Sequence, residues 1–269
     1  MINEQRKLNK AIKKRNGGAA PPTKAPLHHP TLLRRKAKHF QYITAFLLCA
    51  ILAALSPVTA QATDVYRNFA ELQANEPETN YNIFATDHAT PVLILAPHGG
   101  SIEGGTSELA RELSNVHSTY LFESLKTPGG FDLHITSTHF DEPTAVQMVA
   151  RHANTVSLHG YKDDREHIIV GGTDPIRGQT LVDRLNAAGF SAELVGEGHR
   201  FAGANPENIA NRCATGESIQ IELSTGLRKS MFGKFSLTGR AGTETAAFYK
   251  FTGLLSAFIN ENYNVGGNE

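Results

Sequence analysis

The sequence predicts an α/β fold: a single domain with a mixed, mostly parallel sheet flanked by helices. Three observations lead to this prediction. Short apolar runs recur after residue 90 and end at Gly-rich turns, as buried strands do. Segments with helical spacing separate these runs, and strands that alternate with helices are typical of a largely parallel sheet. Residues 63–269 are also long enough to bury one sizeable core.

The first half of this body begins with its clearest strand. The run VLILA at 92–96 is wholly apolar and stops at the turn PHGG. A helix is predicted over 106–113, because apolar residues recur there at helical spacing and acidic residues come early. The alternating segments 119–122 and 133–136 are predicted to be strands. A proline suited to the first helical turn opens the next helix, at 143–152.

The second half continues the same alternation. Short strands are expected at 155–158 and 167–170, which end at His-Gly and Gly-Gly. Segment 176–188 is amphipathic, and a glycine follows it at the position of a C-cap. A helix is therefore expected there. The remaining elements are strands at 192–195 and 218–223 and a closing helix at 242–262.

The N-terminal part differs from this body in charge. Residues 1–62 contain eleven Lys or Arg and one acidic residue, whereas the remainder contains 15 basic and 25 acidic residues. Segment 32–62 has the parts of a signal peptide: a basic start, the apolar stretch 43–55, and the small-x-small pattern Ala60-Gln61-Ala62. Residues 1–31 are interpreted as a basic disordered extension or as the product of a misassigned start site.

This predicted signal peptide indicates an exported protein, periplasmic or secreted. An uncleaved membrane anchor is the alternative, and it is then the part through which the chain contacts a membrane. The apolar stretch 43–55 is, however, shorter than the about 20 residues that cross a bilayer. We therefore expect cleavage after Ala62 and a body that begins at residue 63.

The composition of the body excludes several classes of protein. Its surplus of acidic residues argues against nucleic-acid binding, which needs clustered Lys and Arg. Two cysteines in the whole chain are too few for a disulfide framework or a Cys-rich zinc module. Nine of the twelve histidines lie after residue 62, so a metal site is expected to use His and carboxylate ligands.

Chemically competent side chains recur where the predicted strands end. His98 and His159 follow two apolar strands, and Glu222 lies near the end of a later one. Residues at the carboxyl ends of separate strands converge on one crevice in open α/β sheets. Two His and one carboxylate form the ligand set of a hydrolytic zinc site, and Glu103 in HGGSIE supplies the carboxylate. Each of these residues alone also has a structural interpretation, as a hydrogen-bonding partner or a surface group.

Five segments then carry a family pattern in their order and spacing: PHGGSIEGGTSELA (97–110), ITSTHFDEP (135–143), VSLHGY (156–161), HIIVGG (167–172) and NPENIANRCATGESIQIELSTGLR (205–228). In these segments the chain resembles the poly-γ-glutamate hydrolase family. The resemblance covers most of residues 65–262 and is absent from 1–62. It implies a zinc carboxypeptidase-like core with one zinc ion, Zn²⁺, and an enzyme that cleaves the γ-amide links of poly-γ-glutamate.

Carried over position by position, the resemblance implies that His98, Glu103 and His159 bind the zinc ion. It also implies that Glu222 is the general base for metal-activated water. Zinc carboxypeptidases have two residues between the first His ligand and the Glu, whereas four stand between them here. A carboxypeptidase-like preference for chain ends therefore does not follow from the resemblance.

A poly-γ-glutamate substrate would carry a free α-carboxylate on every unit, which arginine forks bind well. Arg212 and Arg228 bracket the Glu222 strand and are the candidates for this contact, with Asn211 as an additional amide. His139 is the candidate for holding a substrate oxygen or stabilising an oxyanion. The alternative for each is a structural hydrogen bond or ion pair, and the acidic body would repel a polyanion unless its cleft is locally positive.

Three functions remain open from the sequence. The leading hypothesis is an exported, monomeric zinc amidohydrolase that cleaves γ-glutamyl amide bonds. A second keeps the zinc site and changes the substrate to cell-wall γ-glutamyl peptides or small N-acyl amino acids. A third is a binding module that holds an acidic polymer without cutting it, which the four chemically competent residues of the site argue against.

Overall fold

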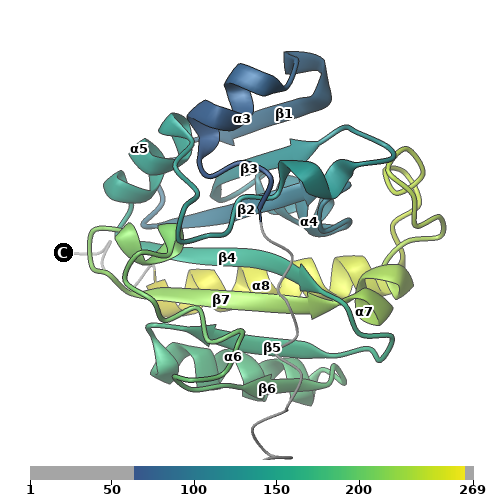
Figure 1. The fold of residues 1–269 in the computed structure, drawn as a ribbon. Coiled ribbons are helices and arrows are strands. Elements are labelled where there is room, and N and C mark those ends of the chain that lie inside the picture. Colours follow the sequence, from purple (N-terminus) through teal and green to yellow (C-terminus); the bar gives the residue numbers. More distant parts are fainter. Residues whose placement is uncertain (1–63, 264–269) are drawn as a thin grey trace, which may run out of the picture. The chain divides into compact units, whose positions relative to one another are not determined.

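Seven strands form one sheet in the residues that the computed structural model describes, 64–263 (Figure 1). The predicted segments 1–31 and 32–62 lie outside the described residues. The strands are β1 (Tyr81–Thr86), β2 (Val92–Gly100), β3 (Ser118–Ser124), β4 (Asn154–Tyr161), β5 (Ile168–Gly172), β6 (Ala192–Leu194) and β7 (Ser218–Ser224). The helices are α3 (Phe69–Asn75), α4 (Thr106–Leu113), α5 (Pro143–Arg151), α6 (Pro175–Ala187), α7 (Thr225–Ser230) and α8 (Ala246–Tyr263), with short 3-10 helices η1 (Glu78–Asn80), η2 (Gly130–Leu133) and η3 (Ile209–Arg212).

The sheet is mixed and mostly parallel, as the sequence predicts. The strand order is β1-β3-β2-β4-β7-β5-β6, and the four strands from β3 to β7 in this order run parallel. The strands β1 and β5 join this parallel block in antiparallel fashion, and β6 then lies parallel to β5. Consequently β2, β4 and β7 all end at one edge of the sheet, which is where ligand crevices form in such folds.

Helices cover both faces of this sheet, so its central strands are buried throughout (Figure 1). On β2, Val92 and Ile94 pack with side chains of α4, α6 and α8, whereas the alternate residues Leu93 and Leu95 pack with α3 and α5. This alternation follows from the period of two residues in a strand. Continuous burial explains why the sequence 92–96 is apolar without a break.

The face towards α5 is polar on β4 and β7. Val156, Leu158, Ile219 and Ile221 point into the core on the opposite face. The residues that alternate with them are polar and buried: Thr155, Ser157 and His159 on β4, and Ser218, Gln220 and Glu222 on β7. A polar strip therefore crosses the core beside these two strands and ends at the edge where they terminate.

One predicted strand, 133–136, is wrong. The segment forms the end of η2 and an irregular stretch after it. Leu133 and Ile135 are buried as the alternation requires, but both sides of β3 are already paired, with β1 and with β2. The sequence analysis also missed β1, α3 and α7. Among residues 64–263, no helix combines the length and hydropathy that crossing a bilayer requires.

Candidate metal centre

Two histidines and a glutamate face one another at the carboxyl edge of the parallel strands. His98 lies near the end of β2 and His159 near the end of β4. Their Nδ1 atoms are 3.2 Å apart. Glu103 lies between them, with Oε1 3.3 Å from His98 Nδ1 and Oε2 3.5 Å from His159 Nδ1. The structure thus brings together the three residues that the sequence predicts as metal ligands.

This arrangement fits a zinc ion. In a tetrahedral site with bonds of about 2.0–2.1 Å, the ligand atoms are about 3.3 Å apart. The three contacts among His98, Glu103 and His159 agree with that spacing. Two imidazole nitrogens and a carboxylate also form the donor set of hydrolytic zinc sites, which leave a fourth position for water or substrate.

A backbone carbonyl fixes the orientation of His98. Its Nε2 lies 2.8 Å from the carbonyl oxygen of Ile135. Because a carbonyl oxygen can only accept, the proton must be on Nε2, which leaves the Nδ1 lone pair of a neutral ring for a metal. Metal-binding histidines commonly donate their other N–H in this way.

The turn after β2 carries Glu103 back over His98. The Glu103 backbone N–H donates to the His98 carbonyl oxygen at 2.8 Å, which closes the turn. Gly100 has φ +68° and lies so close to the backbone of Ser124 that a Cβ would collide with it. The Gly160 backbone N–H donates to Glu103 Oε2 at 2.8 Å. The glycines around the ligands therefore serve close backbone approach.

The charges of the ligands support one another. Burial opposes ionisation of Glu103, but the imidazoles of His98 and His159 hold the pKa of its carboxyl well below the usual range. Burial likewise opposes a charge on His159, yet Glu103 raises the pKa of its imidazole. The carboxylate is thus held ionised, as a ligand for a cation must be.

Glu222 adjoins the centre from the neighbouring strand. It is the β7 residue in register with His159, and it is 6% exposed. Burial raises the pKa of its carboxyl to about 7. Gln220 Nε2 donates to Glu222 Oε1 at 3.0 Å, and Asn208 Nδ2 donates to Gln220 Oε1 at 2.9 Å. Gln220 therefore holds the Glu222 carboxylate and is itself held by Asn208, an arrangement that the sequence analysis missed.

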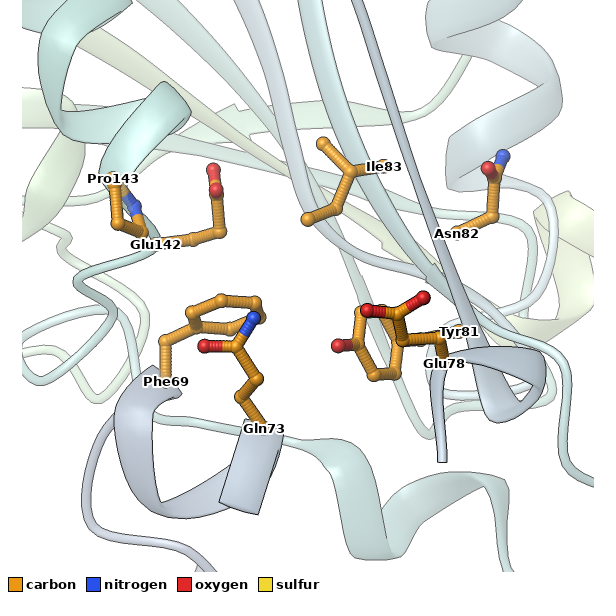
Figure 2. A pocket seen from close by; sticks show the side chains of 8 residues that line it. All are labelled: Phe69, Gln73, Glu78, Tyr81, Asn82, Ile83, Glu142 and Pro143. Carbon is orange, nitrogen blue, oxygen red and sulfur yellow. The ribbon is translucent and has the colours of Figure 1, made fainter. Parts of the chain in front are cut away.

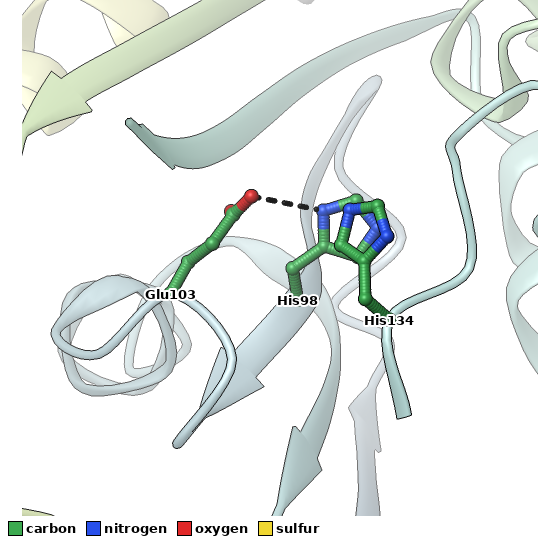
Figure 3. A group of neighbouring side chains, drawn as sticks. All are labelled: His98, Glu103 and His134. Atoms are coloured by element: carbon green, nitrogen blue, oxygen red, sulfur yellow. Dashed lines mark ion pairs between the residues drawn. The ribbon is translucent and has the colours of Figure 1, made fainter. Parts of the chain in front are cut away.

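A third imidazole, His134, also lies at the centre and was missed because its segment was predicted as a strand. Its ring centroid is 4.2 Å from that of His98 (Figure 3). Burial, and then His98, lower the pKa of His134 to about 4. Its ligand atoms lie within 4.8 Å of those of His98 and Glu103, so these three also form a possible metal group. We favour His159 as the ligand, because its Nδ1 lies close to both His98 and Glu103.

Two predicted substrate contacts are buried and already bonded. Arg228, on α7, is 5% exposed and donates to the carbonyl oxygens of Leu223, Gly104 and Tyr161. Asn211 Nδ2 donates to the carbonyl oxygens of Gly203 and Asn205. Substrate binding by these two residues stays a prediction, and the contacts observed here are structural.

The two other predicted contacts lie nearer the surface. His139 is exposed, and its backbone N–H donates to Thr136 O. The side chain of Arg212 is 34% exposed, and its Nη2 donates to the carbonyl oxygens of Thr138 and Glu207. Arg212 therefore ties the loop that carries His139 to the segment before η3, and part of its guanidinium faces solvent.

A second buried arginine, Arg240, supports the ligand turn and was also missed. Its Nη2 donates to Gly100 O at 2.7 Å, and its Nε donates to Glu108 at 2.7 Å. Arg228 Nη1 donates to Gly104 O, at the other end of the turn, at 2.7 Å. Arg240 and Arg228 therefore hydrogen-bond to the two ends of the turn that carries Glu103, at Gly100 and Gly104. A sequence does not distinguish such buried arginines from solvated ones.

A cavity of about 360 Å³ lies elsewhere, between α3, β1 and the start of α5 (Figure 2). Phe69, Tyr81 and Glu142 are among its lining residues, and no predicted site residue lines it. The cavity is therefore separate from the candidate metal centre.

Comparisons with known proteins identify the family of this chain. Residues 66–254 match the family model described as poly-γ-glutamate hydrolase. The SPbeta prophage-derived UPF0714 protein YoqZ of Bacillus subtilis (strain 168) is 48% identical over 263 residues, which cover 94% of this chain and 95% of YoqZ. The UPF0714 protein YndL of the same organism is 51% identical over 217 residues, which cover 80% of this chain and 86% of YndL.

Two solved structures share the fold. A zinc-free, apo form of YndL has a TM-score of 0.74 and 53% identity, and the match covers 75% of this chain and 100% of that one. A bacteriophage poly-γ-glutamate hydrolase has a TM-score of 0.71 and 37% identity, with 76% and 100% coverage. The resemblance and the fold class predicted from the sequence are thereby confirmed. The chain belongs to the poly-γ-glutamate hydrolase family.

Proposed function

We propose that this chain is an exported, zinc-dependent amidohydrolase that cleaves the γ-glutamyl amide bonds of poly-γ-glutamate. One zinc ion would be held by His98, Glu103 and His159. The observation that carries the proposal is the 3.2–3.5 Å spacing of their donor atoms beside the carboxylate of Glu222, in a chain of this family.

The residues of the centre divide the chemistry between them. A zinc ion held there would supply a Lewis acid for the amide carbonyl and for water. Glu222 takes the proton from the attacking water and delivers it to the leaving amine. The Gln220 amide keeps the Glu222 carboxylate in one orientation, and burial keeps bulk water from it.

The substrate-binding residues are proposed on charge and exposure. Arg212 combines a partly exposed guanidinium with a position next to the His139 loop, so we propose that it meets an α-carboxylate of the polymer. His139, being exposed on that loop, is proposed to contact a substrate oxygen. Arg228 and Asn211 hold neighbouring segments through Gly104 O and Gly203 O, and a substrate contact by either residue stays a prediction.

The second candidate keeps the same centre with a different amide substrate, such as a cell-wall γ-glutamyl peptide or a small N-acyl amino acid. The family match favours the polymer over these. A non-catalytic binding module is disfavoured, because such a module needs neither a complete ligand set nor a buried carboxylate beside it.

Chain-length analysis of poly-γ-glutamate tests the proposal. Purified protein is incubated with the polymer, with and without a zinc chelator, and its metal content is measured in parallel. We expect shortening that the chelator abolishes and that added zinc restores, and the early product sizes separate internal from terminal cleavage. An intact polymer with a protein that contains one zinc ion per chain would overturn the proposed substrate and favour the smaller amides.

A further inference from the structure

We propose that Asp64 and His134 form a carboxylate–imidazole pair that presents His134 Nε2 to the substrate as a hydrogen-bond acceptor. In this pair His134 is a further catalytic residue, and Asp64 is the positioning residue that acts through it. The inference rests on the proposed function and deepens it. The family match begins at residue 66, so Asp64 lies before the matched region.

Asp64 binds both ends of one short segment. Its Oδ1 is 2.7 Å from His134 Nδ1, and its Oδ2 accepts the Thr136 backbone N–H at 2.6 Å. The residue between them, Ile135, offers its carbonyl oxygen to His98 Nε2. One carboxylate at the start of the described chain thus positions His134 and, through the same segment, the metal ligand His98.

The hydrogen bonds fix the tautomer of His134. A carboxylate only accepts, and both oxygens of Asp64 are in use, so the bond at Nδ1 requires the proton there. The other nitrogen, Nε2, then carries a lone pair. The ring cannot turn away freely, because Phe131 stacks on it at 4.8 Å and 8° while His98 lies at 4.2 Å. Figure 3 shows the His134 ring beside that of His98 at the centre.

The position of His134 sets its role. Glu222 adjoins His159 from β7, whereas His134 adjoins His98 from the loop after η2. These two side chains therefore meet different parts of a bound substrate. Phe131, which stacks on His134, is 49% exposed, so this flank lies near the surface, where a polymer can lie. The polymer has an amide N–H in every unit. Such an N–H can donate a hydrogen bond to the lone pair of His134 Nε2.

A fourth protein ligand is the competing role for His134. Three ligands with an open position characterise catalytic zinc, whereas four protein ligands close the site to substrate. His159 already completes the closely spaced set. This difference makes zinc content the measurement that separates the two roles.

Two variants in protein produced from the complete sequence test the pair. His134→Phe keeps a flat ring and removes both nitrogens. In Asp64→Asn, the amide oxygen remains with the Thr136 N–H, so the amide NH₂ faces His134 Nδ1. That contact moves the imidazole proton to Nε2 and turns the acceptor into a donor. Asp132→Asn, an exposed acid nearby that pairs with Lys126, is the matched control.

We expect kcat/KM on poly-γ-glutamate to fall about 10- to 100-fold in each of the two variants, with one zinc ion per chain retained. The double variant Asp64→Asn/His134→Phe should be no worse than His134→Phe alone, because Asp64 acts through His134. A purely structural role for Asp64 would instead make the two losses multiply. Asp132→Asn should match the wild type in activity.

Three results would overturn the pair. These are wild-type activity in Asp64→Asn, multiplying losses in the double variant, or loss of zinc in His134→Phe to the extent seen in His159→Ala. If the wild type with bound zinc leaves the polymer intact, the proposed function itself fails. If the wild type cleaves the polymer and the variants do so equally well, this inference alone fails.

Discussion

Arg228 Nη1 donates to the carbonyl oxygen of Gly104 at 2.7 Å, across 124 positions of the chain. Through this bond the helix that follows β7 holds the turn that carries Glu103. The same guanidinium also donates to Tyr161 O, at the end of β4. One buried cation therefore ties together the three strand ends that bear His98, His159 and Glu222.

Gly160→Ala should disturb this junction. A Cβ on Gly160 would lie 2.5 Å from Arg228 Cζ, and the hydrogen bonds of Arg228 prevent its guanidinium from moving aside. We expect a loss of about 1–3 kcal/mol in the free energy of unfolding, together with weaker zinc binding. Denaturant unfolding and a zinc titration measure the two effects.

Gly253→Ala is the control for that substitution. It lies within α8 and has nothing within 4 Å of an added Cβ, so alanine should stabilise the helix by about 0.5–1 kcal/mol. If both variants unfold at the same denaturant concentration as the wild type, the crowding argument for Gly160 is wrong.

Arg240→Met should destabilise the protein strongly. The change leaves Gly100 O without its buried donor and Glu108 without its 2.7 Å partner. Breaking such a buried pair costs about 3–5 kcal/mol in the free energy of unfolding. In Arg111→Met, which breaks an exposed 2.7 Å pair with Glu123, the loss should be about 0–1 kcal/mol. Equal losses in the two variants, measured by urea unfolding, would contradict the role given to Arg240.

Glu222→Gln should separate metal binding from chemistry. The amide keeps the shape of the carboxylate but cannot take a proton, so polymer cleavage should fall by about 10²- to 10⁴-fold with zinc content unchanged. Glu193→Gln, at the exposed residue of β6, serves as the matched control and should retain activity. Cleavage at the wild-type rate by Glu222→Gln would remove this residue as the base.

His159→Ala should lose zinc, because it deletes one of three closely spaced donors. His199→Ala changes an exposed histidine and should keep one ion per chain. Metal analysis after gel filtration measures both. Full zinc content in His159→Ala would transfer the third ligand position to His134.

The sequence predicts the strands that carry the site because their apolar residues follow strand patterns, continuous in 92–96 and alternating with polar residues in 155–158 and 218–223. His98, His159 and Glu222 then meet through the convergence of parallel strand ends. The short edge strand β1 lacks such a pattern, since its burial is incomplete, and the sequence analysis missed it.

The remaining parts of the site depend on contacts that no local pattern encodes. His134 and Asp64 lie 70 positions apart, and their pairing appears once the segment 133–136 is seen as a loop. Arg228 is predicted from the sequence either to bind substrate or to make a structural ion pair, and its burial and its bond to Gly104 O cannot be read from the sequence. Arg240 reaches back 140 positions to Gly100. These contacts join residues that lie far apart in the chain, so no local sequence pattern shows them.

The proposed metal ligands His98 and His159 lie near the ends of central strands, whereas Phe131, His139 and Arg212 lie on segments that connect strands and helices. This division makes the protein modular for engineering. Grafting the segments 130–141 and 203–212 from a relative would change which polymer is accepted, because binding contacts concentrate on loops that a rigid scaffold supports. Such a graft must keep His134 and Ile135 together with Asp64, because this group positions His98. It must also keep Asn208, which supports Glu222 through Gln220.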